Sequence, residues 1–82
     1  MLSYISFINN TEYPFVSVYD DSRVLADCIQ RRQKSRFFVE DAGSVTITVK
    51  DNRNNIFLDI YMSLYPNEFY VINICDGFAE FI

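Results

Sequence analysis

The sequence predicts an all-β domain, an antiparallel β-sandwich of about six or seven strands. Apolar and polar residues alternate through most of the chain, as they do in half-buried strands. Short segments rich in Asn, Asp, Pro and Gly interrupt this alternation at intervals of about eight to twelve residues, the spacing of turns in sandwiches and barrels. Eight Phe and six Tyr supply material for a dense core.

Each expected strand lies between two turn signals. Pro14 excludes a helix after the first strand, and Gly43 can adopt the positive φ that a turn before 44–50 requires. In 44–50, Val45, Ile47 and Val49 alternate with Ser and Thr, so this is the clearest strand. The expected strands span 4–8, 15–19, 23–29, 36–39, 44–50, 56–64 and 69–75.

The segment 22–34 carries an alternative, which is one short helical turn. Ser22 could cap a helix there, and Val24, Leu25, Cys28 and Ile29 follow at helical spacing. The window is short for an independent helix. Both a short or irregular edge strand and a helical turn near 22–34 therefore stay open.

Three segments resemble a family of short bacterial all-β domains of unknown function, often found on secreted and cell-surface proteins. They are VSVY at 16–19, AGSVTITV at 42–49 and FYVINI at 69–74. The resemblance covers most of the chain and implies an immunoglobulin-like or transthyretin-like sandwich without catalytic residues. The chain departs from the family in the turn after VSVY, where 20–22 reads Asp-Asp-Ser in place of a glycine-containing turn.

Size and charge limit the classes of function. With 82 residues, the chain is expected to form a single domain, 1–82, that ends in an apolar tail, 78–82. A net charge of −4 argues against general nucleic-acid binding, which needs a broad basic surface. The start of the chain lacks the features of a secretion signal, and no apolar run approaches the ~20 residues of a membrane span. We expect a cytoplasmic protein, or a secreted one if the chain is a trimmed mature form.

The residues needed for common catalytic mechanisms are scarce, and we expect no enzyme activity and no cofactor. The chain has no His, which removes the commonest general base and metal ligand. Two glycines do not make a phosphate-binding loop. Most carboxylates fall in turns, where Asp is favoured for local reasons. Cys28 and Cys75 lack CxxC spacing, so two free thiols are expected and no metal site.

A basic stretch, QRRQKSR at 30–36, stands out in this acidic chain. It holds four of the seven Lys and Arg residues. Basic residues at a sheet edge discourage unwanted strand pairing and can form ion pairs with acidic turns. The stretch could also bind an acidic protein partner or another anionic surface. The candidates for such contacts are Arg31, Arg32, Lys34 and Arg36.

Two expected strands are apolar on both sides, which predicts an interaction surface. In 56–64 and in 69–75, aromatic and aliphatic residues lie opposite the core-facing set, interrupted by Asp59 and Asn73. Asp59 is interpreted either as a surface charge that discourages strand-on-strand aggregation or as half of an ion pair with the basic stretch. The two strands are expected to pair as a hairpin across 65–68, so that their outer side chains form one patch.

The patch makes a non-catalytic module that forms a homodimer, or docks onto another protein, the leading hypothesis. The tail 78–82 could cover the patch, extend the last strand or enter a neighbouring molecule. The interface candidates are Phe57, Tyr61, Phe69, Val71, Phe78 and Phe81. The alternative is a small-ligand or carbohydrate-binding module in which Tyr13, Tyr19, Tyr61, Tyr65 or Tyr70 provides a stacking platform.

Overall fold

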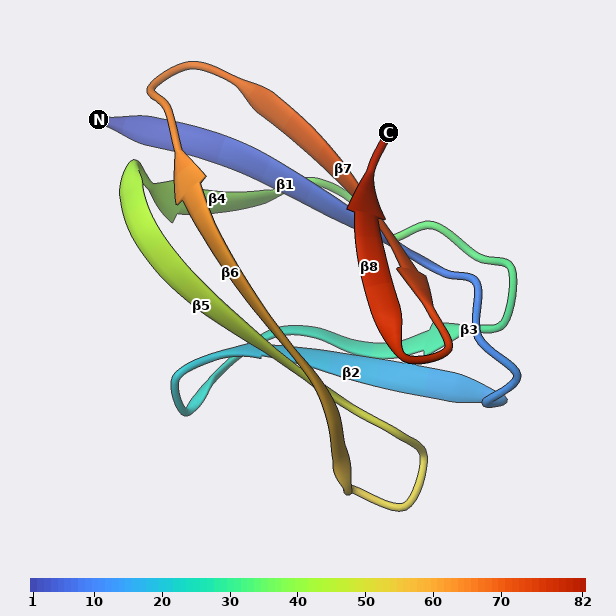
Figure 1. Cartoon of the computed structure of the whole chain (residues 1–82). Helices are drawn as coiled ribbons and strands as arrows, with labels where there is room; N and C mark the ends of the chain where they lie inside the picture. The colour runs from blue at the N-terminus through green and yellow to red at the C-terminus, as the bar shows by residue number, and fades with distance from the viewer.

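The computed structural model describes residues 1–82 and contains eight β-strands and no helix (Figure 1). No segment therefore has the helical length and apolarity of a membrane span. The strands are β1 (Leu2–Asn9), β2 (Phe15–Asp20), β3 (Arg23–Gln30), β4 (Phe38–Asp41), β5 (Gly43–Lys50), β6 (Ile56–Leu64), β7 (Phe69–Cys75) and β8 (Phe78–Phe81).

The strands form two four-stranded sheets that enclose a shared core, in a sandwich-like arrangement. Sheet A has the order β4-β1-β7-β8, and sheet B has the order β3-β2-β5-β6. The all-β prediction is confirmed, but the expectation of a purely antiparallel sandwich is wrong. Strands β1 and β7 pair in parallel, with Tyr4 beside Phe69 and Asn9 beside Ile74, so sheet A is mixed. Strands β1 and β7 lie far apart in the chain. The alternation within a strand carries no information about which distant strand it pairs with.

The predicted alternation places the core correctly. In β2, Val16 and Val18 are fully buried, and in β5, Ile47 and Val49 are fully buried. Sheet A contributes the inward-facing residues of β1 and β7 to the same core: Ile5, Phe7, Ile72 and Ile74. Burial of these side chains supplies most of the driving force for folding.

The segment 22–34 contains the edge strand β3 and no helix, so the helical-turn alternative is wrong. The register between β2 and β3 shifts twice, and Cys28 has a φ of 54°. These are the marks of a β-bulge, which adds a residue to one strand and reverses its alternation. Ala26 and Ile29 consequently both face the core although they are three positions apart, a spacing that would place them on opposite sides of a regular strand. This bulge produces the spacing that resembles a helix in the sequence.

The expected tail is a strand of sheet A. Asp76 and Gly77 form a two-residue turn, and Phe78 pairs with Cys75, so β7 and β8 form a hairpin. Gly77 has a φ of 86°, which glycine adopts without strain. The tail thus forms a separate strand at the edge of sheet A, and does not continue β7 as one of the alternatives expected.

The expected hairpin between β6 and β7 does not exist. Strand β6 is an edge of sheet B, and β7 lies between β1 and β8 in sheet A. The connection 65–68 therefore crosses from one sheet to the other (Figure 1). The outward side chains of the two strands lie on opposite outer faces of the sandwich, and the single predicted patch is divided in two.

Two buried polar groups connect the sheets. The Asn9 side-chain amide donates to the carbonyl oxygen of Ile29 over 2.9 Å, and its Oδ1 accepts from the Thr11 backbone over 3.0 Å. At another corner of the sandwich, the Arg23 guanidinium contacts the carboxylates of Asp20 and of Glu40. Glu40 belongs to β4, whereas Asp20 and Arg23 belong to sheet B, so this ion-pair cluster joins the two layers.

Candidate functional site

An aromatic cluster lies on the outer side of sheet A. The rings of Tyr4 and Phe69 stack with centroids 4.6 Å apart and an interplanar angle of 15°. The Phe37 ring meets the Phe69 ring edge-on, with centroids 5.3 Å apart. Leu2, Val39 and Ile82 are exposed around these rings. We call these six residues the aromatic face.

The sheet register assembles the aromatic face from distant parts of the chain. Tyr4 is paired with Phe69 of β7 on one side and with Val39 of β4 on the other. Ile82 joins because its backbone amide donates to the Val71 carbonyl over 3.0 Å. Phe69 remains 63% exposed although it contacts two other rings. The rings are therefore fixed in position by their neighbours while they remain accessible.

Opposite charges lie at the two ends of the aromatic face. Lys34 forms a bridge with Ile8, near the end of β1, and its ammonium group lies 5.1 Å from the Phe37 ring centroid. Asp41 is paired with Leu2 at the start of β1. Both residues are exposed, and neither forms a salt bridge within the chain. The face thus combines an apolar centre with one free cation and one free carboxylate.

The predicted interface residues divide between several surfaces. Phe69, Val71 and Phe78 lie on the outer side of sheet A. Tyr61 is 76% exposed on the outer side of sheet B. Phe57 is half-buried and packs against Tyr13 with ring centroids 4.9 Å apart, whereas Phe81 is 60% exposed although its ring lies 6.1 Å from that of Tyr70.

The predicted tyrosine platform is not present as one surface. Tyr19 lies under the Lys50 ammonium group at 4.5 Å, and the Tyr70 hydroxyl accepts from the backbone amide of Tyr65 over 2.7 Å. Tyr61 and Tyr65 are the largely exposed members, and they project from β6 and from the following turn. The five tyrosines thus lie in separate environments.

The basic stretch has two parts with different contacts. Arg31 donates to the carbonyl oxygen of Glu12, and Arg32 donates to Asn10 Oδ1 over 2.9 Å and lies 3.7 Å from the Glu12 carboxylate. These two arginines hold the loop between β1 and β2, as the structural interpretation of the stretch predicts. Lys34 and Arg36 contact aromatic rings instead and have no carboxylate partner.

The carboxylates are dispersed. Asp59 accepts a hydrogen bond from the Thr48 hydroxyl over 3.0 Å and does not form the ion pair with the basic stretch that was one of the two interpretations. No group of three or more Cys, Asp or Glu side chains is arranged to hold a metal ion. Both cysteines are free thiols, Cys28 exposed and Cys75 half-buried. Partial burial and nearby acidic groups raise the pKa of Cys75.

Of the aromatic face, only Phe69 was among the predicted interface residues. The other five members were not: Leu2, Tyr4, Phe37, Val39 and Ile82. Their alternation marks them as outward-facing, but their assembly depends on β1 pairing with both β4 and β7. The available signal was the outward position of Tyr4 in an otherwise apolar strand. Pairing across the domain could not be derived from it.

Comparison of the chain with protein-family models, with curated proteins and with solved structures found no match. The resemblance to the bacterial all-β family stays a prediction. The same holds for the immunoglobulin-like or transthyretin-like type of sandwich.

Proposed function

We propose that the chain is a non-catalytic interaction module that forms a homodimer through the aromatic face of sheet A. The observation that supports this most directly is the pair of exposed rings, Phe37 and Phe69, in contact with each other and with the half-buried Tyr4. Contiguous exposed apolar patches commonly mark interaction sites, and Tyr and Phe are enriched in the cores of interfaces. The strand pairings and ring contacts already fix these side chains, which reduces the entropy lost on association.

The charges at the ends of the face favour a second copy of the chain as the partner. A two-fold axis through the middle of the face would reverse β1 in one copy relative to the other. Lys34 of one protomer would then approach Asp41 of its partner, and the reciprocal pair would form at the other end. A face with one free charge of each sign at opposite ends is complementary to itself in this arrangement.

The central test compares Phe69→Lys with Tyr61→Lys in light scattering coupled to size exclusion. Phe69, at the start of β7, and Tyr61, within β6, are both exposed aromatics, but they lie on opposite outer faces. We expect a dimer for the wild type and for Tyr61→Lys, and a folded monomer for Phe69→Lys. A monomeric wild type at high micromolar concentration would contradict the proposal, as would equal dissociation by both substitutions.

A charge reversal tests the orientation of the dimer. Lys34→Glu and Asp41→Lys should each weaken dimerisation several-fold, because each places like charges opposite one another. The double variant restores the pair with reversed signs and should recover most of the affinity. Sedimentation equilibrium measures the dimer dissociation constant of the wild type and the three variants. If the two losses of affinity simply add in the double variant, the two residues do not meet across the interface.

The tyrosine-based ligand module has weaker support. Tyr65 and Tyr70 share one hydrogen bond, but no contact joins all five residues into one platform. If the wild type is monomeric, docking onto a different protein replaces self-association as the use of the aromatic face.

A further inference from the structure

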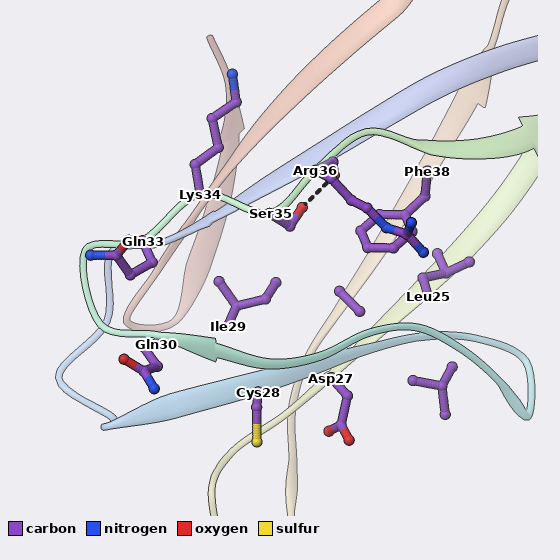
Figure 2. A pocket seen from close by; sticks show the side chains of 12 residues that line it. Leu25, Asp27, Cys28, Ile29, Gln30, Gln33, Lys34, Ser35, Arg36 and Phe38 are labelled. Carbon is purple, nitrogen blue, oxygen red and sulfur yellow. Dashed lines mark hydrogen bonds between the residues drawn. The ribbon is translucent and has the colours of Figure 1, made fainter.

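A groove lies between the edge strands β3 and β4, where the two sheets separate. Its volume is about 620 Å³, within the range of about 300–1,000 Å³ typical of small-molecule sites. Leu25 and Ile29 project into it from β3, and Phe38 approaches from β4 (Figure 2). Leu25 and Ile29 also belong to the core cluster, and Phe38 packs against it, so the floor of the groove is the apolar interior of the sandwich.

Arg36 provides a cation on the wall of this groove. Its guanidinium carbon lies 5.2 Å from the centroid of the Phe38 ring, and Figure 2 shows its side chain beside that ring. The Arg36 side chain forms no salt bridge and donates no hydrogen bond within the chain, in contrast to Arg31 and Arg32. Its guanidinium donors are therefore free to bind an anion, and its stacked position holds them at the mouth of an apolar cavity.

The other two charged residues that line the groove, Asp27 and Lys34, direct their side chains away from it. Figure 2 shows the side chains of Asp27 and Cys28 directed to the opposite side of β3, away from the groove. The Asp27 carboxylate accepts from the Ser17 hydroxyl over 2.9 Å. Lys34 extends away from the groove, toward Phe37 on the aromatic face. The groove therefore presents one unpaired positive charge over an apolar floor.

We propose that this groove binds a small organic anion with an apolar body, such as a medium-chain or aromatic carboxylate. The apolar part would contact Leu25, Ile29 and Phe38, and the carboxylate would accept two parallel hydrogen bonds from the Arg36 guanidinium. Charge complementarity selects this class: a neutral apolar molecule leaves the guanidinium unpaired, and a small inorganic anion leaves the floor uncovered.

This site is separate from the proposed dimer interface. The groove opens between the inner sides of β3 and β4, whereas the aromatic face covers the outer side of sheet A. The two proposals can therefore succeed or fail independently. Ligand binding is measured on the wild type and on Phe69→Lys, so that loss of dimerisation alone leaves the result for the groove intact.

The experiment is a titration of the nitrogen-15-labelled protein with octanoate, followed by amide chemical shifts. Octan-1-ol serves as the neutral control with the same chain length. We expect saturable shifts centred on Leu25, Ile29, Arg36 and Phe38 with octanoate, and at least about tenfold weaker binding with octan-1-ol. Shifts centred on Tyr4 and Phe69, or no saturation at millimolar octanoate, would overturn the proposal.

A matched pair of variants isolates the role of the guanidinium. Arg36→Gln removes the charge at the groove, and Arg53→Gln removes an equal charge from the exposed turn between β5 and β6. We expect octanoate affinity to fall about tenfold or more in Arg36→Gln and to stay within about twofold in Arg53→Gln. An equal effect of both substitutions would show that only the overall charge matters, and the proposed site would be wrong.

Discussion

Glu40 is the acidic side chain that the fold buries, with only 5% of the residue exposed. The pKa of its carboxyl group is raised from 4.5 to about 7, chiefly by burial and also by the nearby Asp20 carboxylate. The Arg23 guanidinium acts in the opposite direction, because its charge favours the ionised form. The balance leaves Glu40 partly protonated near neutral pH, at the point where β4 meets sheet B.

The raised pKa makes stability depend on pH in a defined direction. Between the unfolded value of 4.5 and the folded value of about 7, the native state binds more protons than the unfolded state, so the free energy of unfolding falls as pH rises. We expect the ionisation of Glu40 to lower the free energy of unfolding by about 2 kcal/mol between pH 5.5 and pH 8. Urea unfolding of the wild type and of Glu40→Gln at both pH values measures this difference. An identical pH dependence in the two proteins would contradict the assignment.

At the scale of the element, the bulge in β3 decides how one edge of the sandwich is built. Cys28 adopts a φ of 54°, a conformation that non-glycine residues rarely take. The extra residue turns Asp27 and Cys28 outward and returns Ile29 to the core. The groove between β3 and β4 depends on this reversal, because Ala26 and Ile29 both line it although they are three positions apart.

Substitutions at Cys28 test whether the bulge is under backbone strain. Cys28→Gly should keep or raise the free energy of unfolding, because glycine accepts a positive φ. Cys28→Val should lower it by about 1–2 kcal/mol, because a β-branched residue strongly disfavours that conformation. Chemical denaturation gives both values, and a Val variant as stable as the Gly variant would show that the bulge is absent in solution.

The strands themselves were predictable, and their partners were not. The bounds of β6 and β7 follow from alternation between turn signals, and Val16, Val18, Ile47 and Val49 face the core as expected. The β7–β8 hairpin had a local signal in Asp76-Gly77, which is a strong turn pair between apolar runs, although 78–82 was expected only as an apolar tail. The sheet that each strand joins depends on contacts between distant segments. For this reason the predicted patch was divided and Tyr4 was missed.

At the scale of the whole molecule, four strand edges face solvent: β4 and β8 in sheet A, and β3 and β6 in sheet B. Strands β4 and β8 are only four residues long, and β3 carries the bulge. Short or bulged edges resist unwanted pairing with another chain. Strand β6 is nine residues long, and Asp59 is its one charged residue. Its protection against edge-to-edge aggregation therefore depends largely on that carboxylate.

Replacing Asp59 should therefore reduce solubility more than stability. Asp59→Val adds an apolar, strand-favouring side chain to the exposed edge, whereas Thr46→Val makes a similar change on the neighbouring strand β5, which is not an edge. We expect faster growth of turbidity on incubation of Asp59→Val at high micromolar concentration, with Thr46→Val close to the wild type. Equal behaviour of the two variants would show that β6 is protected in another way.

The parallel pairing of β1 with β7 also orders events during synthesis on the ribosome. Sheet B uses strands that emerge in sequence, since β2–β3, β2–β5 and β5–β6 are all complete once residue 64 has left the exit tunnel. Strand β1 emerges first but acquires its second neighbour only when 69–74 follow. A nascent chain that stops short of β7 thus carries a complete sheet B and an N-terminal strand whose inner residues Ile5 and Phe7 lack half of their cover.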